Sequence, residues 1–209
     1  MQEIPRSPQA LLETFATFAS CDIADAGGLP LPPGLAAVHP VESLCGFART
    51  VQLAPGDNLG LQALAVQAKP GDVLVAVGGG EEAALVGELL SLRASVRGAQ
   101  GFLLDGYARD EAALALPVFA RGLQPRRPAR RDFVALDQPV RLLGVPIRPG
   151  DLVRADADGI VVVPRESLED VLRQVAGVLA ANAATRARIL AGEDLGWLER
   201  DLARRGQAD

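Results

Sequence analysis

Lysine, histidine and cysteine are almost absent from this chain of 209 residues, and each scarcity excludes a class of chemistry. The only lysine, Lys69, precedes a Pro-Gly pair in a predicted turn. A lysine that forms a Schiff base or binds pyridoxal phosphate requires a desolvated pocket, so this position argues against both chemistries. One histidine (His39) and two distant cysteines (Cys21 and Cys45) cannot supply the usual zinc ligand sets. A Ser-His-Asp triad would depend entirely on His39. Carboxylates and arginines are therefore the side chains expected to carry any catalysis.

Long apolar runs are also missing. The sequence has no stretch near the roughly 20 apolar residues that a membrane-spanning helix needs, and its first residues lack the profile of a signal peptide. The charged side chains sum to 21 − 26 = −5, which argues against a general nucleic-acid-binding protein. The two cysteines are interpreted as reduced thiols, because nothing suggests secretion. We therefore expect a cytoplasmic protein that binds neither membranes nor nucleic acids.

Aromatic residues make up 4% of the chain against 49% hydrophobic residues, so alanine, leucine and valine must build the core. We expect one compact domain over residues 1–209. Hydrophobic periodicity predicts helices at residues 11–19, 22–26, 58–68, 81–96 and 167–191, and strands at 47–53, 73–77, 102–104, 116–120, 139–143, 152–154 and 160–163. Residues 29–40 and 121–138 are predicted loops. Helices at both ends of a strand-rich middle indicate an α/β fold with a mixed sheet, not a regular βαβ alternation.

Residues 78–83 (Gly-Gly-Gly-Glu-Glu-Ala) follow a predicted strand, open a predicted helix and fit a dinucleotide-binding fingerprint. However, Glu81 and Glu82 would occupy the first helical turn, where a pyrophosphate needs the amides and the positive dipole end to itself. The second half of the chain also lacks the strand-helix alternation of a doubly wound sheet. A tight strand-to-helix turn therefore accounts for these glycines better than nucleotide binding does.

Gly87 and Glu88 interrupt the predicted helix at residues 81–96. A glycine inside a helix costs about 1 kcal/mol relative to alanine. Gly87 could mark close packing, or it could mark the true N-terminus of a helix whose amides are free to hold an anion. Glu88 could be a solvated helix residue or a functional carboxylate among apolar neighbours. The residues alone leave both questions open.

Arg109 and Asp110 form the most informative pair in the chain, beyond the end of a buried strand at residues 101–104. Asp110 is predicted to begin a short helical segment at 110–115 and to stay ionised beside the guanidinium. An ionised carboxylate is a hard ligand that suits Mg²⁺ or Mn²⁺, and Mg²⁺ typically combines one or two carboxylates with several waters. Arg109 could clamp a substrate carboxylate or the oxyanion formed when a 2-keto acid enolises. The alternative is an ordinary surface ion pair.

A basic run at residues 126–131 contains four arginines and no aromatic residue. Binding of single-stranded RNA commonly uses aromatic side chains on which bases stack. This run is therefore interpreted as a solvated loop or a subunit contact rather than as an RNA-binding segment.

Several short segments, taken in order along the chain, resemble one known family. They are Asp22-Ile23-Ala24-Asp25-Ala26, Gly46-Phe47-Ala48-Arg49-Thr50-Val51, Pro70-Gly71-Asp72-Val73-Leu74-Val75, Gly87-Glu88-Leu89-Leu90, Leu104-Asp105-Gly106-x-x-Arg109-Asp110, Pro117-Val118-Phe119-Ala120, Pro149-Gly150-Asp151-Leu152-Val153 and Asp156-x-Asp158-Gly159-Ile160-Val161-Val162-Val163-Pro164. Together they resemble the RraA-like family, which includes 4-hydroxy-4-methyl-2-oxoglutarate aldolases and the regulator of ribonuclease activity A. The resemblance covers roughly residues 20–195, which we take as the core of the domain.

The resemblance implies a three-layer β/β/α swivelling-type fold, assembled as homotrimers or homohexamers. Aldolases of this family are class II enzymes, which use a divalent metal to split a 4-hydroxy-2-keto acid into pyruvate and a second keto acid. They often decarboxylate oxaloacetate as well. The expected function is therefore that of a carbon–carbon lyase acting on a small keto acid, with Mg²⁺ or Mn²⁺ as cofactor. The alternative within the family is a non-catalytic regulatory or binding protein of the ribonuclease-regulator type.

The aldolase signature of the family is an acid, twenty intervening residues and then Arg-Asp, which Glu88, Arg109 and Asp110 match here. By this match Asp110 holds the metal, while Arg109 contacts the substrate and stabilises the pyruvate enolate. Glu88 would act as the proton-transfer group through a water on the metal. The amides expected to bind the keto-acid carboxylate are those of Gly87, Glu88, Leu89 and Leu90.

Two positions depart from the family pattern. Relatives often carry an acid three residues after the metal-binding Asp, where this chain has Ala113. Many relatives also carry a Lys-Glu pair in the C-terminal helix that approaches a neighbouring subunit's site, where this chain has Ala181-Asn182-Ala183-Ala184. Both departures favour a different substrate or a lower aldolase efficiency. Asp110 argues for catalysis, because the ribonuclease regulators lack that residue.

Overall fold

The computed structural model of the protein describes residues 7–38, 43–78, 83–132, 135–193 and 196–206. Two features raised by the sequence lie outside these described residues. They are His39 and residues 79–82 of the glycine-rich segment.

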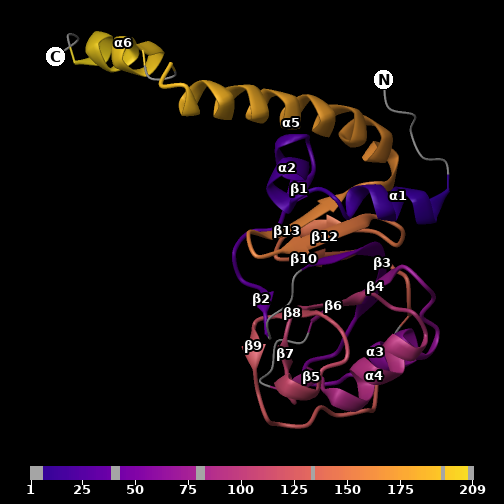
Figure 1. Ribbon diagram of the computed structural model, residues 1–209. Coiled ribbons are helices and arrows are strands. Elements are labelled where there is room, and N and C mark those ends of the chain that lie inside the picture. The colour runs from indigo at the N-terminus through magenta and orange to yellow at the C-terminus, as the bar shows by residue number, and fades with distance from the viewer. Residues whose placement is uncertain (1–6, 39–42, 79–82, 133–134, 194–195, 207–209) are drawn as a thin grey trace.

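An eight-stranded sheet forms the centre of the structure (Figure 1). Its strands, in sheet order, are β1 (Leu29–Pro30), β13 (Gly159–Val163), β12 (Leu152–Asp156), β3 (Leu44–Gln52), β4 (Asp72–Val77), β6 (Gly101–Leu104), β8 (Val118–Ala120) and β2 (Ala36–Ala37). Strands β3, β4, β6 and β8 are parallel to one another, whereas the remaining four join through antiparallel pairing. The predicted α/β fold with a mixed sheet is confirmed.

Smaller elements surround this sheet. Two further groups of strands are a parallel sheet of β5 (Ala84–Val86), β7 (Tyr107–Ala108) and β9 (Gly122–Leu123), and a hairpin of β10 (Val140–Leu142) and β11 (Val145–Ile147). The helices are α1 (Pro8–Phe15), α2 (Ser20–Asp25), α3 (Leu59–Val66), α4 (Glu88–Val96), α5 (Leu168–Leu190) and α6 (Gly196–Arg205), with short 3₁₀ turns η1 (Glu111–Ala113) and η2 (Arg165–Ser167).

Alternate side chains of β4 separate the two faces of the main sheet, as the period of a strand requires. On one face, Leu74 and Ala76 belong to the same core as the buried leucines of α3 and α4. On the other face, Val73, Val75 and Val77 belong to a second core, which includes the apolar side chains of the β10–β11 hairpin. A helical layer, the main sheet and a hairpin layer therefore lie one upon another, which is the β/β/α arrangement expected from the family resemblance.

The long helix α5 begins on the sheet and then leaves it. Its first turns pack with α1 and α2 in a third core that includes Phe15, Ile23 and Val171. Beyond that core, residues 179–190 are exposed, and Figure 1 shows α5 extending away from the sheet with α6 at its far end. Within the described ranges, the structure has no helix with the length and apolar character needed to cross a membrane.

One predicted helix is wrong at residues 83–87. Residues 81–96 were expected to form a single helix, but Ala84–Val86 is strand β5 and the helix begins at Glu88. An apolar run of this length has no periodicity that separates a strand from a buried helix. The predicted loops at 29–40 and 121–138 also contain strands β1, β2 and β9, each of two residues, which is too short to leave a pattern.

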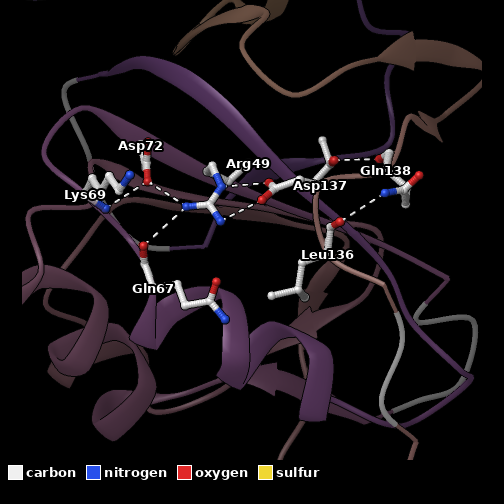
Figure 2. Close-up of polar contacts among 8 residues, drawn as sticks. Arg49, Gln67, Lys69, Asp72, Leu136, Asp137 and Gln138 are labelled. Carbon is white, nitrogen blue, oxygen red and sulfur yellow. Dashed lines mark hydrogen bonds and ion pairs between the residues drawn. The ribbon is translucent and has the colours of Figure 1, made fainter.

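Arg49 attaches the end of the predicted loop 121–138 to the main sheet (Figure 2). Its guanidinium donates two hydrogen bonds to the Asp137 carboxylate, from Nε to Oδ1 and from Nη2 to Oδ2, both at 2.7 Å. The third nitrogen, Nη1, lies 3.3 Å from Asp72 Oδ2 and 3.3 Å from the carbonyl oxygen of Gln67. The hydrogen bonds to Asp137 are the main reason that the pKa of Arg49 is raised, against a smaller lowering by burial.

We expect Arg49→Ala to lower the free energy of unfolding by about 2–4 kcal/mol, because the partly buried carboxylates of Asp72 and Asp137 would lose their cationic partner. Urea denaturation should show a lower midpoint at an unchanged slope. The control is Arg148→Ala, since the Arg148–Glu166 pair is mostly exposed, with 61% and 63% of the two side chains accessible. Loss of that pair should change stability by less than about 1 kcal/mol. Equal losses in both variants would contradict the anchoring role of Arg49.

Candidate active site

The small parallel sheet β5–β7–β9 brings three separate chain segments to one edge. Strand β5 pairs in parallel with β7, and β7 pairs in parallel with β9. Because the carboxyl ends of parallel strands lie at the same edge of a sheet, the residues that follow each strand meet there. These residues are 87–90 after β5, Arg109 and Asp110 after β7, and the segment beginning at Gln124 after β9, whose N–H donates to the Ala108 carbonyl at 2.9 Å.

Gly87 is the N-cap of α4, so the helix begins directly at this edge. The amides of the first helical turn have no partner within the helix, and they carry the positive end of the helix dipole. The N–H of Glu88 donates to Asp110 Oδ2 at 3.2 Å. A β-carbon added at position 87 would lie 2.5 Å from the same oxygen and 3.0 Å from Arg109 Cγ. Gly87 therefore begins the helix and also allows a close approach of the Asp110 carboxylate, whereas anion binding by the amides of this turn stays a prediction.

We expect Gly87→Ala to reduce any activity of this site by about 10²-fold while leaving the fold stable. The added methyl group must displace the Asp110 carboxylate, which is the end of a side chain and can move, and a shift of about 1 Å in a reacting group can cost that much. Steady-state kinetics and a thermal melt would separate the two effects. Full activity in the variant would show that the position of the Asp110 carboxylate does not matter.

Arg109 and Asp110 lie beside the start of α4, and one backbone hydrogen bond joins Arg109 to β5. The N–H of Arg109 donates to the Val86 carbonyl at 2.9 Å. The Arg109 Nε lies 3.4 Å from Asp110 Oδ2, and the two side chains are 32% and 40% exposed. Asp110 has a left-handed backbone with φ 57°, an uncommon conformation in which aspartate is enriched and which often marks functional sites. It is the N-cap of η1, close to the predicted start of a short helical segment.

The pair lines a cavity of about 560 Å³, a volume typical of small-molecule sites. Its lining residues come from α3, β5, α4, the end of β7 and the segment after β9: Asn58, Gln62, Ala84, Leu85, Gly87, Leu89, Leu90, Arg93, Arg109, Asp110, Arg127, Pro128, Ala129, Arg130 and Arg131. Within the part of the chain that the structure describes, five of the lining residues are arginines and Asp110 is the only acid. The cavity is therefore strongly positive, which suits an anionic ligand.

The structure brings most of the predicted site residues together. Gly87, Leu89, Leu90, Arg109 and Asp110 all line the cavity. Glu88 is the exception, because its side chain is exposed and is not among the lining residues, while its N–H contacts Asp110. The proton-transfer role of Glu88 stays a prediction.

Residues 127–131, which we call the arginine strap, form a wall of the cavity that the sequence interpretation missed. The strap contains Arg127, Arg130 and Arg131, and it was interpreted as part of a solvated loop or subunit contact. Its three arginine side chains are exposed, but its backbone is bound to another segment: the N–H of Ala129 donates to the Gly56 carbonyl at 2.7 Å, and the Ala129 carbonyl accepts from the Asn58 N–H at 3.1 Å. These contacts join positions about 70 residues apart, so no local signal in the sequence could have revealed them.

Asp57 holds the strap in place with a buried carboxylate. Its Oδ2 accepts the N–H of Arg131 at 2.6 Å and the N–H of Asp132 at 3.3 Å, while its Oδ1 accepts the N–H of Leu59 at the start of α3. Burial raises the pKa of Asp57, but these three backbone hydrogen bonds and the charge of Arg131 lower it by more, so the net shift is downward. The carboxylate therefore stays ionised and links the strap to α3.

A divalent cation fits the residues at this site. Among the described residues, the structure has no group of three or more His, Cys, Asp or Glu side chains able to surround a metal ion. A cation in the cavity would therefore be held by Asp110 as the one carboxylate ligand, with water in the remaining positions, and Mg²⁺ accepts such a set. The Asp110 carboxylate is 40% exposed at the cavity wall, and the absence of a side chain at Gly87 lets its Oδ2 approach the start of α4, so this carboxylate would serve as that single ligand.

Comparisons with known proteins agree with the family predicted from the motifs. A family model described as RraA-like (Aldolase/RraA) matches residues 20–162. A Halalkalibacterium halodurans protein, provisionally named 4-hydroxy-4-methyl-2-oxoglutarate aldolase, is 36% identical over 166 residues, which cover 77% of this chain and 79% of the relative. An uncharacterised protein of Methanocaldococcus jannaschii is 31% identical over 183 residues, covering 85% and 88% of the two chains.

Solved structures with a similar fold point to the same family as the sequence relatives. The RNA-processing inhibitor RraA from Thermus thermophilis superposes with a TM-score of 0.65 at 27% identity, over 70% of this chain and 93% of that one. Streptomyces coelicolor RraAS2, described as an unusual member of the RNase ES inhibitor RraA family, superposes with a TM-score of 0.76 at 28% identity, over 88% and 99%. The motifs, the fold and these relatives together show that the chain belongs to the RraA-like family.

Proposed function

We propose that the protein is a divalent-metal-dependent carbon–carbon lyase. Its substrates would be 4-hydroxy-2-keto acids of the 4-hydroxy-4-methyl-2-oxoglutarate type, cleaved to pyruvate and a second keto acid, and it would also decarboxylate oxaloacetate. The observation that carries this proposal is the position of Arg109 and Asp110 side by side on a positive cavity, next to the N-terminus of α4. The curated relative at 36% identity bears an aldolase name, which supports the same reaction class.

The proposed chemistry assigns one task to each part of the site. A bound Mg²⁺ or Mn²⁺ would act as a Lewis acid on the keto oxygen of the substrate. Asp110 would hold the cation, and the guanidinium of Arg109 would stabilise the negative charge that develops on that oxygen as the carbon–carbon bond breaks. The first-turn amides of α4, from Leu89 and Leu90, would bind the carboxylate next to the keto group. Glu88 is the proposed proton-transfer group.

Oxaloacetate provides the most direct test of the lyase proposal. The purified protein should release pyruvate from oxaloacetate in the presence of Mg²⁺ or Mn²⁺, faster than the metal alone does, and excess chelator should abolish the difference. A rate equal to the metal-only background would reject the lyase function and would favour the regulatory alternative, the class to which the name of the Thermus thermophilis neighbour points.

We also propose that the protein acts in the cytoplasm as a homotrimer or a homohexamer. The exposed second half of α5 supports an assembly, because residues 179–190 include Leu179, Ile189 and Leu190 with 37%, 54% and 79% of their surface accessible. Light scattering should give three or six times the chain mass of 21.8 kDa. A monomeric mass at micromolar concentration would contradict the assembly.

A further inference from the structure

We infer that Ser91 is a positioning residue of the proposed active site. It holds segment 110–115, which begins with Asp110, against the first turn of α4, and thereby sets the affinity of the site for a divalent cation. This inference rests on the proposed function, because it takes Asp110 as the metal ligand. Ser91 itself is not among the residues that line the cavity, so it acts through the groups that it holds in place.

Ser91 occupies a position where an apolar residue is expected. It is fully buried in α4, with 0% of its surface exposed, between Leu90 and Leu92. Serine is a weaker helix former than alanine, and a buried hydroxyl group costs free energy unless it forms hydrogen bonds. The next buried position of the same helix is Ala94, so packing alone does not require a hydroxyl group here. The serine is therefore explained by the hydrogen bonds of its side chain.

The hydroxyl group of Ser91 joins two chain segments that meet at the site. Its Oγ donates to the Glu88 carbonyl at 3.0 Å and accepts the N–H of Ala115 at 2.9 Å. The N–H of the same Glu88 donates to Asp110 Oδ2 at 3.2 Å. Hydrogen bonds therefore run from the Asp110 carboxylate through Glu88 and Ser91 to Ala115, and bonds linked in this way support one another. Both ends of segment 110–115 are thus attached to one helical turn.

Segment 110–115 is attached chiefly through its backbone. Three of its six residues are exposed alanines, which have no polar side-chain group. Its internal hydrogen bonds, from the N–H groups of Ala113 and Leu114, shape the turn without joining it to another element. Asp110 has a left-handed backbone, which is unfavourable for a residue other than glycine and persists only where the surrounding structure enforces it. The hydrogen bond to Ser91 supplies part of that constraint.

The test measures the affinity of the protein for Mn²⁺ alone, without substrate, from the electron paramagnetic resonance signal of the free ion. Loss of a group that holds a metal ligand in place typically weakens metal binding by about 10–100-fold. Ser91 acts through Glu88 and the segment, so Ser91→Ala should raise the dissociation constant by about tenfold. Ser91→Cys keeps the shape of the side chain but is a weaker donor and acceptor, so its affinity should fall between those of Ser91→Ala and the wild type.

A second readout follows the hydrogen bond itself in the metal-free protein. Amide hydrogen exchange at Ala115, resolved by nuclear magnetic resonance, should be about fivefold faster or more in Ser91→Ala, because the N–H loses its acceptor. Ser20→Ala is the matched control. Ser20 is another buried helical serine, whose Oγ donates to Asp156 Oδ1 at 2.6 Å, and neither residue lines the cavity. This variant should change neither the exchange at Ala115 nor the affinity for Mn²⁺.

The proposal is overturned if Ser91→Ala binds Mn²⁺ as tightly as the wild type, if Ser20→Ala weakens binding equally, or if the exchange at Ala115 is unchanged. An affinity of Ser91→Cys below that of Ser91→Ala also overturns it, because packing rather than hydrogen bonding would then be responsible. A wild-type protein that binds no Mn²⁺ overturns it as well. Neither measurement needs turnover, so a failure of the lyase proposal in the oxaloacetate assay is a separate result.

Discussion

Replacing Asp110 will reduce metal-dependent pyruvate release to the rate of the metal alone. Among the described residues, Asp110 is the only acid that lines the cavity, so its loss removes the proposed protein ligand of the cation. Lewis-acid stabilisation is worth several kcal/mol, which corresponds to a loss on the order of 10³-fold or more in rate. The measurement is oxaloacetate decarboxylation over a range of Mn²⁺ concentrations.

The choice of variant follows from the backbone at this position. Asp110 has φ 57°, a region that asparagine tolerates better than alanine does. Asp110→Asn therefore keeps the local conformation and removes the charge, whereas Asp110→Ala also strains the turn. Glu111→Ala is the control, because it removes an exposed acid one residue away that does not line the cavity. Metal-dependent turnover that persists in both Asp110 variants would refute the assignment of the metal ligand.

Arg109→Ala should lower kcat/KM by about 10²–10³-fold, equivalent to about 3–4 kcal/mol of transition-state stabilisation. The guanidinium lies at the cavity wall beside the carboxylate and is proposed to stabilise the oxyanion that forms when the bond breaks. The loss should fall mainly on kcat, because the interaction strengthens as charge develops. Arg109→Lys should recover only part of the rate, since an ammonium group cannot reproduce the planar pair of donors.

A second arginine–aspartate pair supplies the control for this result. Arg121 donates to Asp105 Oδ1 at 2.7 Å, but neither residue lines the active-site cavity. Arg121→Ala should therefore leave kcat within about twofold of the wild type, because it changes no interaction with the reacting groups. If Arg109→Ala were equally harmless, the pair at positions 109 and 110 would be an ordinary surface ion pair.

The sequence could predict those parts of the site that are encoded locally. Arg109 and Asp110 follow a recognisable strand, and Gly87 interrupts an apolar stretch. Each of these features can be recognised from a few neighbouring residues. The prediction was wrong where the local sequence is ambiguous, as at Ala84–Val86, whose apolar residues suit a helix and a strand equally well. The sheet β5–β7–β9 that joins the pieces consists of strands of two or three residues, so its existence could not be predicted.

The arginine strap shows a second reason why the sequence alone could not predict the whole site. Its role depends on Asp57, which lies 74 residues before Arg131 and contacts its backbone rather than its side chain. Any residue except proline could supply that N–H, so the contact imposes almost no requirement on sequence at position 131. The composition of the strap was visible from the start, but its position on the cavity became evident only from the fold.

The most direct test of the central claim is a crystal structure of the protein with Mn²⁺ and pyruvate. The anomalous signal of manganese should lie within coordination distance of an Asp110 carboxylate oxygen, about 2.0–2.1 Å by analogy with Mg²⁺, with Arg109 contacting the keto oxygen of pyruvate. A manganese ion bound elsewhere, or a pyruvate that contacts neither Arg109 nor the amides of residues 87–90, would contradict this account.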